Sequence, residues 1–251
     1  MSALLEIRNL KKAFGGLTVT DDVSLVLERG ARTALIGPNG AGKTTLINLV
    51  TGQLKPNSGT VHLAGQDVTR LPTVSRVKAG LVRSFQVTRL FPELSPRDHL
   101  ALAVLQREGR TGAMFGHHER LPDLMGEVDA ILSQLRLHPI GDQPVSAIAY
   151  GQQRLLELAI ALSQRPKVLL LDEPAAGVPQ SETSLIEEAL AALPADLAVL
   201  MIDHDMDLVF RFAKEVVVLA AGRVIFTGPA SEVASDKGVR EAYLGSYADA
   251  R

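Results

Sequence analysis

Eight consecutive residues carry the strongest chemical signal in this chain. Gly37-Pro38-Asn39-Gly40-Ala41-Gly42-Lys43-Thr44 matches the pattern G-x-x-x-x-G-K-[ST], in which glycines let backbone N–H groups turn inward around a phosphate. Lys43 is then expected to bridge β- and γ-phosphates, and the Thr44 hydroxyl to ligate Mg²⁺. A helix that begins here adds the partial positive charge of its N-terminus. This phosphate loop, residues 37–44, predicts a site for a magnesium-bound nucleoside triphosphate.

Two acids follow an apolar run later in the chain. Val168 to Leu171 are all apolar and lead directly into Asp172 and Glu173. Carboxylates at the carboxyl end of a strand lie where open α/β sheets bind their ligands. Asp172 is expected to hold Mg²⁺ through water. Glu173 is expected to orient the water that attacks the γ-phosphate, or to take its proton.

Gln86 and His204 follow strand-like runs in the same way, after residues 81–85 and 198–203. Gln86 can reach Mg²⁺ or the attacking water, and His204 can contact the γ-phosphate as a donor or positioning group. A single glutamine or histidine at a strand end is as often an ordinary surface residue. Position alone therefore leaves both interpretations open.

Alternating strands and helices are expected to position these residues. The turn and periodicity patterns predict strands at 4–7, 23–27, 33–36, 60–63, 168–171, 198–202, 216–219 and 223–226, and helices at 43–51, 95–106, 119–135, 151–164, 181–193 and 206–213. The stretch 94–149 is mainly helical, with a surface loop at 107–118. Strands that alternate with helices favour a mostly parallel sheet.

Composition narrows the class of protein. The 251 residues are 46% hydrophobic and 22% charged, which is typical of a folded domain and excludes disorder of the whole chain. A formal charge of -2 gives no electrostatic surface for nucleic acid or anionic lipid. The absence of cysteine excludes disulfides and thiolate zinc sites. No signal peptide or membrane-spanning run is expected, so any membrane contact should go through a partner.

Taken in order, the motifs resemble the nucleotide-binding subunit of ATP-binding cassette (ABC) transporters. The resemblance runs essentially end to end and includes, besides the phosphate loop, Ser84-Phe85-Gln86, Ile148-Ala149-Tyr150-Gly151-Gln152-Gln153-Arg154, Leu171-Asp172-Glu173-Pro174 and Asp203-His204-Asp205. It implies an α/β fold, with a P-loop NTPase (RecA-like) core, an antiparallel β subdomain and an inserted helical subdomain. The implied organisation is one ABC ATPase domain, residues 1–251. Its core and β subdomain take residues 1–93 and 150–251, and its helical subdomain takes residues 94–149.

The resemblance also implies how nucleotide is held. In this family two subunits close head to tail on two ATP molecules, each between the phosphate loop of one subunit and the signature segment, here residues 148–154, of the other. The implied ATP contacts are Phe14 on the adenine, residues Gly37 to Thr44 with Thr45 on the phosphates, and the partner's signature residues corresponding to Ala149, Gly151 and Gln152. The implied catalytic residues are Lys43, Gln86, Glu173 and His204, and the implied Mg²⁺ ligands are Thr44, Gln86 and Asp172.

Finer features are similar to the branched-chain amino acid importers of this family, among them Phe14-Gly15-Gly16-Leu17, Glu173-Pro174-Ala175-Ala176-Gly177 and Ala242-Tyr243-Leu244-Gly245. This similarity implies two membrane permease subunits, an external substrate-binding protein reached indirectly, and no nucleic-acid partner. The motor is then expected at the cytoplasmic face of the inner or plasma membrane, as a homodimer or with a related ATPase. Val87, Leu90 and Phe91 are expected to face the permease. A soluble non-transport ABC ATPase and a catalytically weak regulatory subunit are the alternatives.

Two residues depart from the family pattern. Ala149 stands where the signature segment usually has serine, and Pro179 stands where the family has aspartate or asparagine. The alanine removes a hydroxyl donor to the partner's γ-phosphate, and the proline removes both a backbone donor and a polar side chain. Weaker ATP-driven closure and weaker communication between the two ATP sites are therefore expected.

Overall fold

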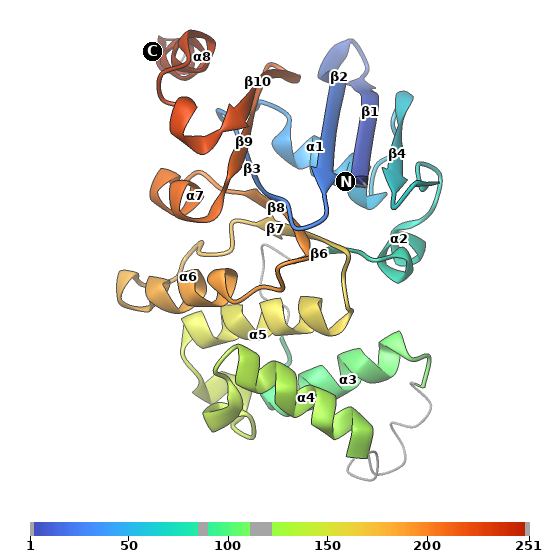
Figure 1. Cartoon of the computed structure of the whole chain (residues 1–251), viewed down its shortest axis with the longest axis vertical. Coiled ribbons are helices and arrows are strands. Elements are labelled where there is room, and N and C mark those ends of the chain that lie inside the picture. The colour runs from blue at the N-terminus through green and yellow to red at the C-terminus, as the bar shows by residue number, and fades with distance from the viewer. Residues whose placement is uncertain (1–2, 85–89, 111–121, 249–251) are drawn as a thin grey trace. The chain divides into compact units, whose positions relative to one another are not determined.

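The structure is a computed structural model that describes residues 3–84, 90–110 and 122–248. The chain divides into two compact units. Unit 1 consists of Met1–Arg83, Lys167–Glu173 and Ala195–Arg251, and unit 2 consists of Ser84–Pro166 and Pro174–Pro194. Figure 1 shows their helices and strands. The expected division into residues 1–93, 94–149 and 150–251 stays a prediction.

Unit 1 contains an antiparallel sheet of four strands in the order β2-β1-β4-β5. The strands are β1 (Ala3–Phe14), β2 (Leu17–Glu28), β4 (Ser58–Leu63) and β5 (Gln66–Asp67). Gly15, with φ of 58°, turns β1 into β2, and the two strands pair from Phe14–Leu17 back to Ala3–Glu28. Along β2, Val23, Leu25 and Leu27 are buried and alternate with exposed residues, so one face of this sheet packs into the core.

The second sheet of unit 1 has six strands in the order β10-β9-β3-β8-β7-β6. These are β3 (Arg32–Ile36), β6 (Leu81–Arg83), β7 (Val168–Asp172), β8 (Ala198–Ile202), β9 (Glu215–Ala220) and β10 (Arg223–Pro229). All neighbours pair in parallel except β9 and β10. Every residue of β8 is buried, as in parallel strands covered on both faces. The prediction of a mostly parallel sheet is confirmed.

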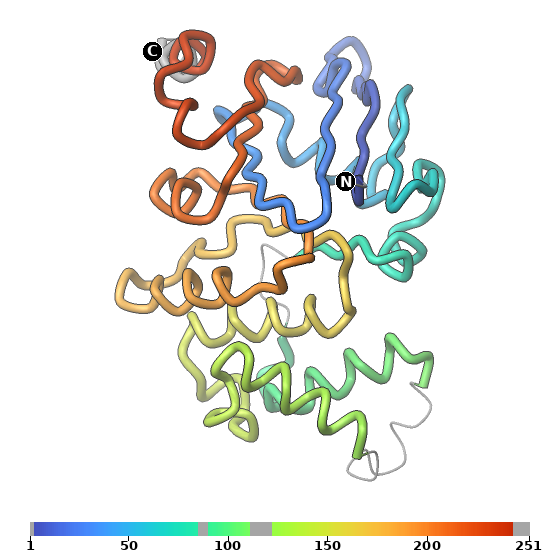
Figure 2. The backbone as a smooth tube through the Cα atoms, in the orientation of Figure 1, coloured from blue at the N-terminus to red at the C-terminus, as the bar shows by residue number. Residues whose placement is uncertain are grey.

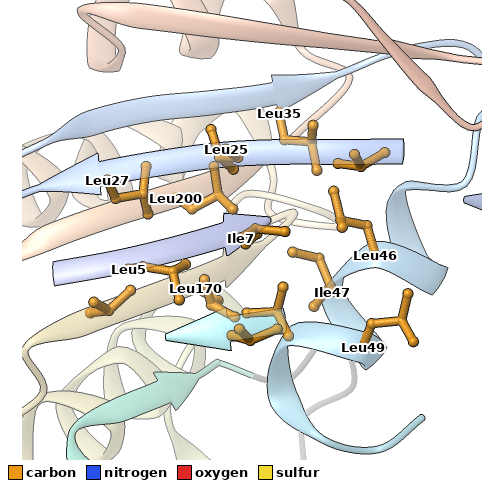
Figure 3. Packing of buried hydrophobic residues seen from close by; sticks show 14 of the residues in the cluster. Leu5, Ile7, Leu25, Leu27, Leu35, Leu46, Ile47, Leu49, Leu170 and Leu200 are labelled. Carbon is orange, nitrogen blue, oxygen red and sulfur yellow. The ribbon is translucent and has the colours of Figure 1, made fainter. Parts of the chain in front are cut away.

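The core of unit 1 joins the two sheets to helix α1 (Lys43–Thr51). Figure 3 shows Leu5 and Ile7 of β1, Leu46 and Ile47 of α1 and Leu200 of β8 among the packed side chains. Burying a side chain of this size stabilises the fold by about 1.5–3 kcal/mol. The cluster therefore fixes β3 and α1, the two elements between which the phosphate loop lies.

Unit 1 also contains the helices α2 (Thr73–Ala79), α7 (Met206–Phe212) and α8 (Lys237–Ala248). Helix α7 was predicted from the sequence, whereas α2 was not. The reason is that α2 is short, rich in β-branched residues, and buries only the side chain of Arg76, so it shows no apolar period.

The described residues of unit 2 form the helices α3 (Pro96–Arg107), α4 (Pro122–Gln134), α5 (Tyr150–Ser163) and α6 (Thr183–Ala191), with 3₁₀ turns η3 (His138–Ile140), η4 (Val145–Ala147) and η5 (Gln180–Glu182). Ser95 and Asp98 cap the start of α3 reciprocally. Helix α6 begins two residues later than predicted because residues 180–182 form η5 instead. In Figure 2, α5 (yellow) and α6 (orange) run side by side.

Candidate functional site

The phosphate loop lies in unit 1 between β3 and α1, and its shape depends on glycine. Gly37 and Gly42 have φ of 154° and 102°, a region that side chains avoid. A Cβ on Gly37 would lie 2.1 Å from the carbonyl oxygen of Leu219, and one on Gly42 would lie 2.5 Å from that of Val19. Neighbouring backbone therefore packs directly against these two glycines, in the loop that leads into α1. A cradle of this kind fits a phosphate group.

Lys43, the first residue of α1, reaches back over the phosphate loop. Its Nζ donates hydrogen bonds to the carbonyl oxygens of Gly37 at 2.6 Å and Pro38 at 3.1 Å. Burial lowers the pKa of Lys43, while the negative charges of Glu173 and Asp172 act in the opposite direction. The structure therefore brings the loop lysine and the two strand-end acids into one electrostatic site.

Asp172 ends β7 and forms an ion pair that the sequence did not predict. Arg83, the last residue of β6, donates from Nη2 to Asp172 Oδ2 and from Nη1 to the Asn48 side chain of α1, the latter at 2.8 Å. Asp172 and Arg83 are both largely buried. Arg83 thereby links two strands and α1 around the carboxylate. The carboxylate of Asp172 and the hydroxyl of Thr44 are hard oxygen donors, which suit Mg²⁺, so the donor set fits the predicted metal.

Glu173 and His204 lie together at the ends of β7 and β8. His204 Nδ1 is 3.3 Å from Glu173 Oε1, and the histidine side chain is 76% exposed. Glu173 has φ of 47°, a left-handed conformation that is uncommon for a residue with a side chain. Its N–H donates to the carbonyl of Ile202 at 2.8 Å, which holds the turn. Strained residues of this kind cluster at functional sites.

Asp203 is a buried acid beside this pair, and sequence reasoning gave it no role. It is 4% exposed. Its Oδ1 accepts the backbone N–H groups of His204 at 2.7 Å and Asp205 at 2.9 Å. Burial raises the pKa of Asp203, the two N–H bonds and His204 lower it, and Glu173 raises it further. Asp203 therefore fixes the backbone that carries His204.

Of the remaining predicted site residues, the structure describes Phe14 but not Gln86. Phe14 ends β1 beside the turn at Gly15 and is exposed, with Lys12 Nζ 5.2 Å from its ring centroid. An exposed ring at this place is available for stacking, and its adenine contact stays a prediction. Gln86 lies outside the described residues, as does Val87.

The signature segment lies in unit 2, at the start of α5. Ala149 is the residue before the helix and has no side-chain cap. The side chain of Gln152 turns back to accept the Ala149 N–H at 3.0 Å. The Gly151 N–H donates to Glu182 Oε2 at 2.8 Å. No local pattern indicated Glu182, which lies 31 positions further along the chain.

Within residues 3–84, 90–110 and 122–248, no group of three or more histidine and acidic side chains is arranged to hold a metal ion. Over the same residues no helix is both long and apolar enough to cross a membrane.

Two family models match the sequence. The model described as "ABC transporter" matches residues 20–176, which include the phosphate loop, the signature segment and the acids Asp172 and Glu173. A second model, "Branched-chain amino acid ATP-binding cassette transporter", matches residues 223–249.

Several relatives match over nearly the whole length. The chain is 35% identical to the high-affinity branched-chain amino acid transport ATP-binding protein BraF of Pseudomonas aeruginosa, over 96% of this chain and 98% of the relative. It is 36% identical to LivG of Salmonella typhimurium and 35% identical to LivG of Escherichia coli K12, with the same coverage. Both LivG proteins have the same description as BraF.

Solved structures agree in fold. A nucleotide-free ATP-binding cassette from an ABC transporter matches with a TM-score of 0.83 at 29% identity, over 96% of this chain and 98% of that chain. The ADP conformation of an ATP-binding cassette of an ABC transporter matches with a TM-score of 0.84 at 29% identity, over 98% and 100%. With the phosphate loop of unit 1 and the whole-chain matches agreeing, this chain belongs to the ABC transporter family, as an ATP-binding cassette subunit.

Proposed function

We propose that this chain binds and hydrolyses ATP as the motor subunit of an importer for branched-chain or related amino acids. The observation that carries the proposal is the site in unit 1, where the phosphate loop, Lys43, Asp172, Glu173 and His204 converge. BraF and LivG, which are branched-chain amino acid transport ATP-binding proteins, support the amino-acid substrate class. The permease partners and the place at the cytoplasmic face of the membrane are part of the proposal and rest on the same relatives.

Each residue of the site has a definite part in the proposed reaction. The backbone N–H groups of the phosphate loop hold the phosphates, and the Lys43 ammonium bridges the β- and γ-phosphates. Glu173 orients the attacking water or takes its proton, and His204, 3.3 Å away, contacts the γ-phosphate. Thr44 and Asp172 would hold Mg²⁺, with Gln86 as the third proposed ligand. When bound, Mg²⁺ neutralises charge on the phosphate oxygens.

Closure of two subunits completes the proposed cycle. Each ATP is then held between the phosphate loop of one subunit and the α5 N-terminus of the other. A helix N-terminus attracts anions through its free N–H groups and its dipole. The chain pairs with itself or with a related ATPase, and ATP binding draws the pair together while hydrolysis releases it.

Replacing Lys43 by alanine tests the assignment of the phosphate loop. The variant loses the ammonium group that contacts the β- and γ-phosphates. We therefore expect the ATPase rate to fall about 100-fold or more. Lys78→Ala, which removes an exposed lysine in α2, is the matched control and should keep the parent rate. Near-parent turnover of Lys43→Ala, measured as phosphate release, would show that the phosphates bind elsewhere.

Replacing Glu173 by glutamine tests the hydrolytic step separately. An amide cannot accept the proton of the water at neutral pH, so we expect kcat to fall by about 10²- to 10⁴-fold while fluorescent ATP analogues still bind. The expected product is an ATP-bound dimer, visible on a sizing column with multi-angle light scattering. Normal hydrolysis by this variant would move the base to another residue, and His204 is the next candidate.

A further inference from the structure

The α5 N-terminus is occupied by an acid from another segment of unit 2. Glu182, the last residue of η5, accepts the Gly151 N–H through Oε2 at 2.8 Å. The contact is close on both sides, because a Cβ built on Gly151 would lie 2.5 Å from the same oxygen. Gly151 itself is buried. The glycine therefore admits the carboxylate, which any larger residue at this position would push away.

The helix supplies no acceptor of its own for this donor. Ala149, at the capping position, has no polar side chain, and α5 has no acidic residue in its first turn. Gln152 is already used, since its side-chain oxygen accepts the Ala149 N–H. A helix N-terminus stabilises a nearby negative charge, and Glu182 provides the charge that the first turn lacks.

Further contacts fasten the segment that carries Glu182. Arg154 of α5 donates from Nη2 to the carbonyl of Ala176 at 3.1 Å. A Cβ on Gly177 would lie 3.4 Å from the ring of Tyr150, so ring and backbone pack closely there. The segment 174–182, which directly follows Glu173, is thus held along the start of α5 at three places. These contacts hold the Glu182 carboxylate in position at the start of α5.

We propose that Glu182 is an intramolecular competitor for the phosphate that the α5 N-terminus receives from the other subunit. The proposal rests on the proposed function, in which that phosphate is the γ-phosphate of ATP. The Gly151 N–H makes one strong hydrogen bond, and two anions at the same helix end repel each other. Glu182 has to leave before the phosphate binds, and its removal makes the closed dimer easier to form.

Two substitutions of Glu182 test this competition. In the Glu173→Gln background, where hydrolysis does not consume ATP, the dimerisation constant is measured by analytical ultracentrifugation with ATP and with ADP. Glu182→Ala removes both charge and acceptor, so dimerisation with ATP should tighten at least about fivefold, since the fraction of binding-competent subunits rises. Glu182→Gln keeps an acceptor but no charge and should tighten it less. With ADP neither variant should change the constant.

Glu188→Gln is the matched control. It removes one negative charge from α6, where Glu188 pairs with Arg136 at an exposed position. Its dimerisation constant should equal that of the parent. Equal tightening by this control would mean that the effect is one of net charge, and the competition proposal would be wrong.

A purely structural role for Glu182 makes the opposite prediction. If the carboxylate only caps α5, its loss destabilises unit 2 and leaves ATP-dependent dimerisation equal or weaker. Tighter dimerisation together with lower or equal stability in urea supports competition, and equal or weaker dimerisation overturns it. If the Glu173→Gln background forms no ATP-dependent dimer with any residue at position 182, the closure step of the proposed function fails as well. A dimer that ignores position 182 contradicts the competition alone.

Discussion

Among the single residues near the candidate site, Asp203 is ionisable and buried. One carboxylate oxygen is used by two backbone N–H groups. The other, Oδ2, has no hydrogen-bond partner among the described residues. An unpaired carboxylate oxygen away from water is costly when the group is ionised. The residue that holds the backbone of His204 therefore does so at some expense to the stability of unit 1.

This cost should appear as a pH dependence of stability. The pKa of Asp203 is raised in the fold, with burial as the largest cause and Glu173 as a further one. Because the pKa is raised in the fold, the folded state holds the proton of Asp203 more tightly than the unfolded state does. The stability that this adds is fully present below the ordinary pKa of 3.8 and is lost as pH rises through the folded-state pKa. Asparagine keeps an acceptor for the two N–H groups and does not ionise. The free energy of unfolding of Asp203→Asn, relative to the parent, should therefore increase as pH rises above 3.8.

Urea denaturation at a series of pH values measures this difference. In a Glu173→Gln background the increase should be smaller, because the negative charge of Glu173, which raises the pKa of Asp203, is gone. His204 acts in the opposite direction and is kept in both backgrounds. A difference that stays constant with pH, or shrinks as pH rises, would show that Asp203 is not protonated more readily in the folded state.

At the scale of elements, the sequence predicted those whose pattern is local. The bounds of α1 and β8 are as predicted, because a glycine loop and Gly52 delimit the helix and an uninterrupted apolar run forms the strand. β1 and β2 are longer than predicted, because their outer ends form an exposed hairpin with polar residues. Helix α2 was missed because it buries an arginine where a periodic helix would bury apolar residues.

That arginine, Arg76 of α2, caps the C-terminal end of α1. It is 2% exposed. Its guanidinium donates to the carbonyls of Leu49 at 2.8 Å and Val50 at 2.5 Å in the last turn of α1, and to those of Thr69 at 2.7 Å and Leu71 at 3.0 Å. A cation at a helix C-terminus is favourable. Arg76 therefore stabilises the end of the helix whose beginning holds the phosphate loop.

We expect Arg76→Met to destabilise unit 1 by about 2–4 kcal/mol, because methionine fills part of the space but makes none of the four hydrogen bonds to backbone carbonyls. The free energy of unfolding in urea measures this loss. Arg70→Met, an exposed position just before α2, is the matched control and should change stability by less than about 0.5 kcal/mol. Equal effects of the two substitutions would mean that water replaces the guanidinium at no cost.

At the scale of the whole molecule, the sequence predicted the fold class and the order of motifs better than the contacts between them. Lys43 was recognised because it belongs to the phosphate-loop pattern, and Glu173 because it closely follows an apolar run. Arg83 and Glu182 were not, since each acts on a partner in a different strand or helix and has no pattern of its own. Asp203 was not either, because its role depends on its burial in the fold, although its hydrogen bonds go to the next two residues. Long-range polar pairs of this kind depend on how elements pack, which one sequence does not encode locally.

The proposed permease contact concerns the assembled transporter and centres on Phe91 in unit 2. The residue is 60% exposed, and its ring stacks on His99 with ring centroids 5.8 Å apart. The Phe91 N–H donates to His99 Nε2 at 2.9 Å, and the other ring nitrogen of His99 lies 2.9 Å from the Ser95 carbonyl. Because Nε2 accepts, Nδ1 carries the proton and donates to Ser95. The backbone at Phe91 is thus held by His99, while the Phe91 side chain stays exposed.

We expect Phe91→Asp to abolish co-purification with the permease subunits and to leave the ATPase rate of the isolated chain nearly unchanged. The hydrogen bond to His99 comes from the backbone and survives the substitution, so unit 2 should still fold. A carboxylate buried against an apolar partner surface without a counter-charge is strongly unfavourable. Phe210→Asp, which places the same charge at another exposed phenylalanine, in α7 of unit 1, should keep the permease bound. Loss of the permease in both variants would indicate a general effect of charge, whereas its retention with Phe91→Asp would place the docking surface elsewhere.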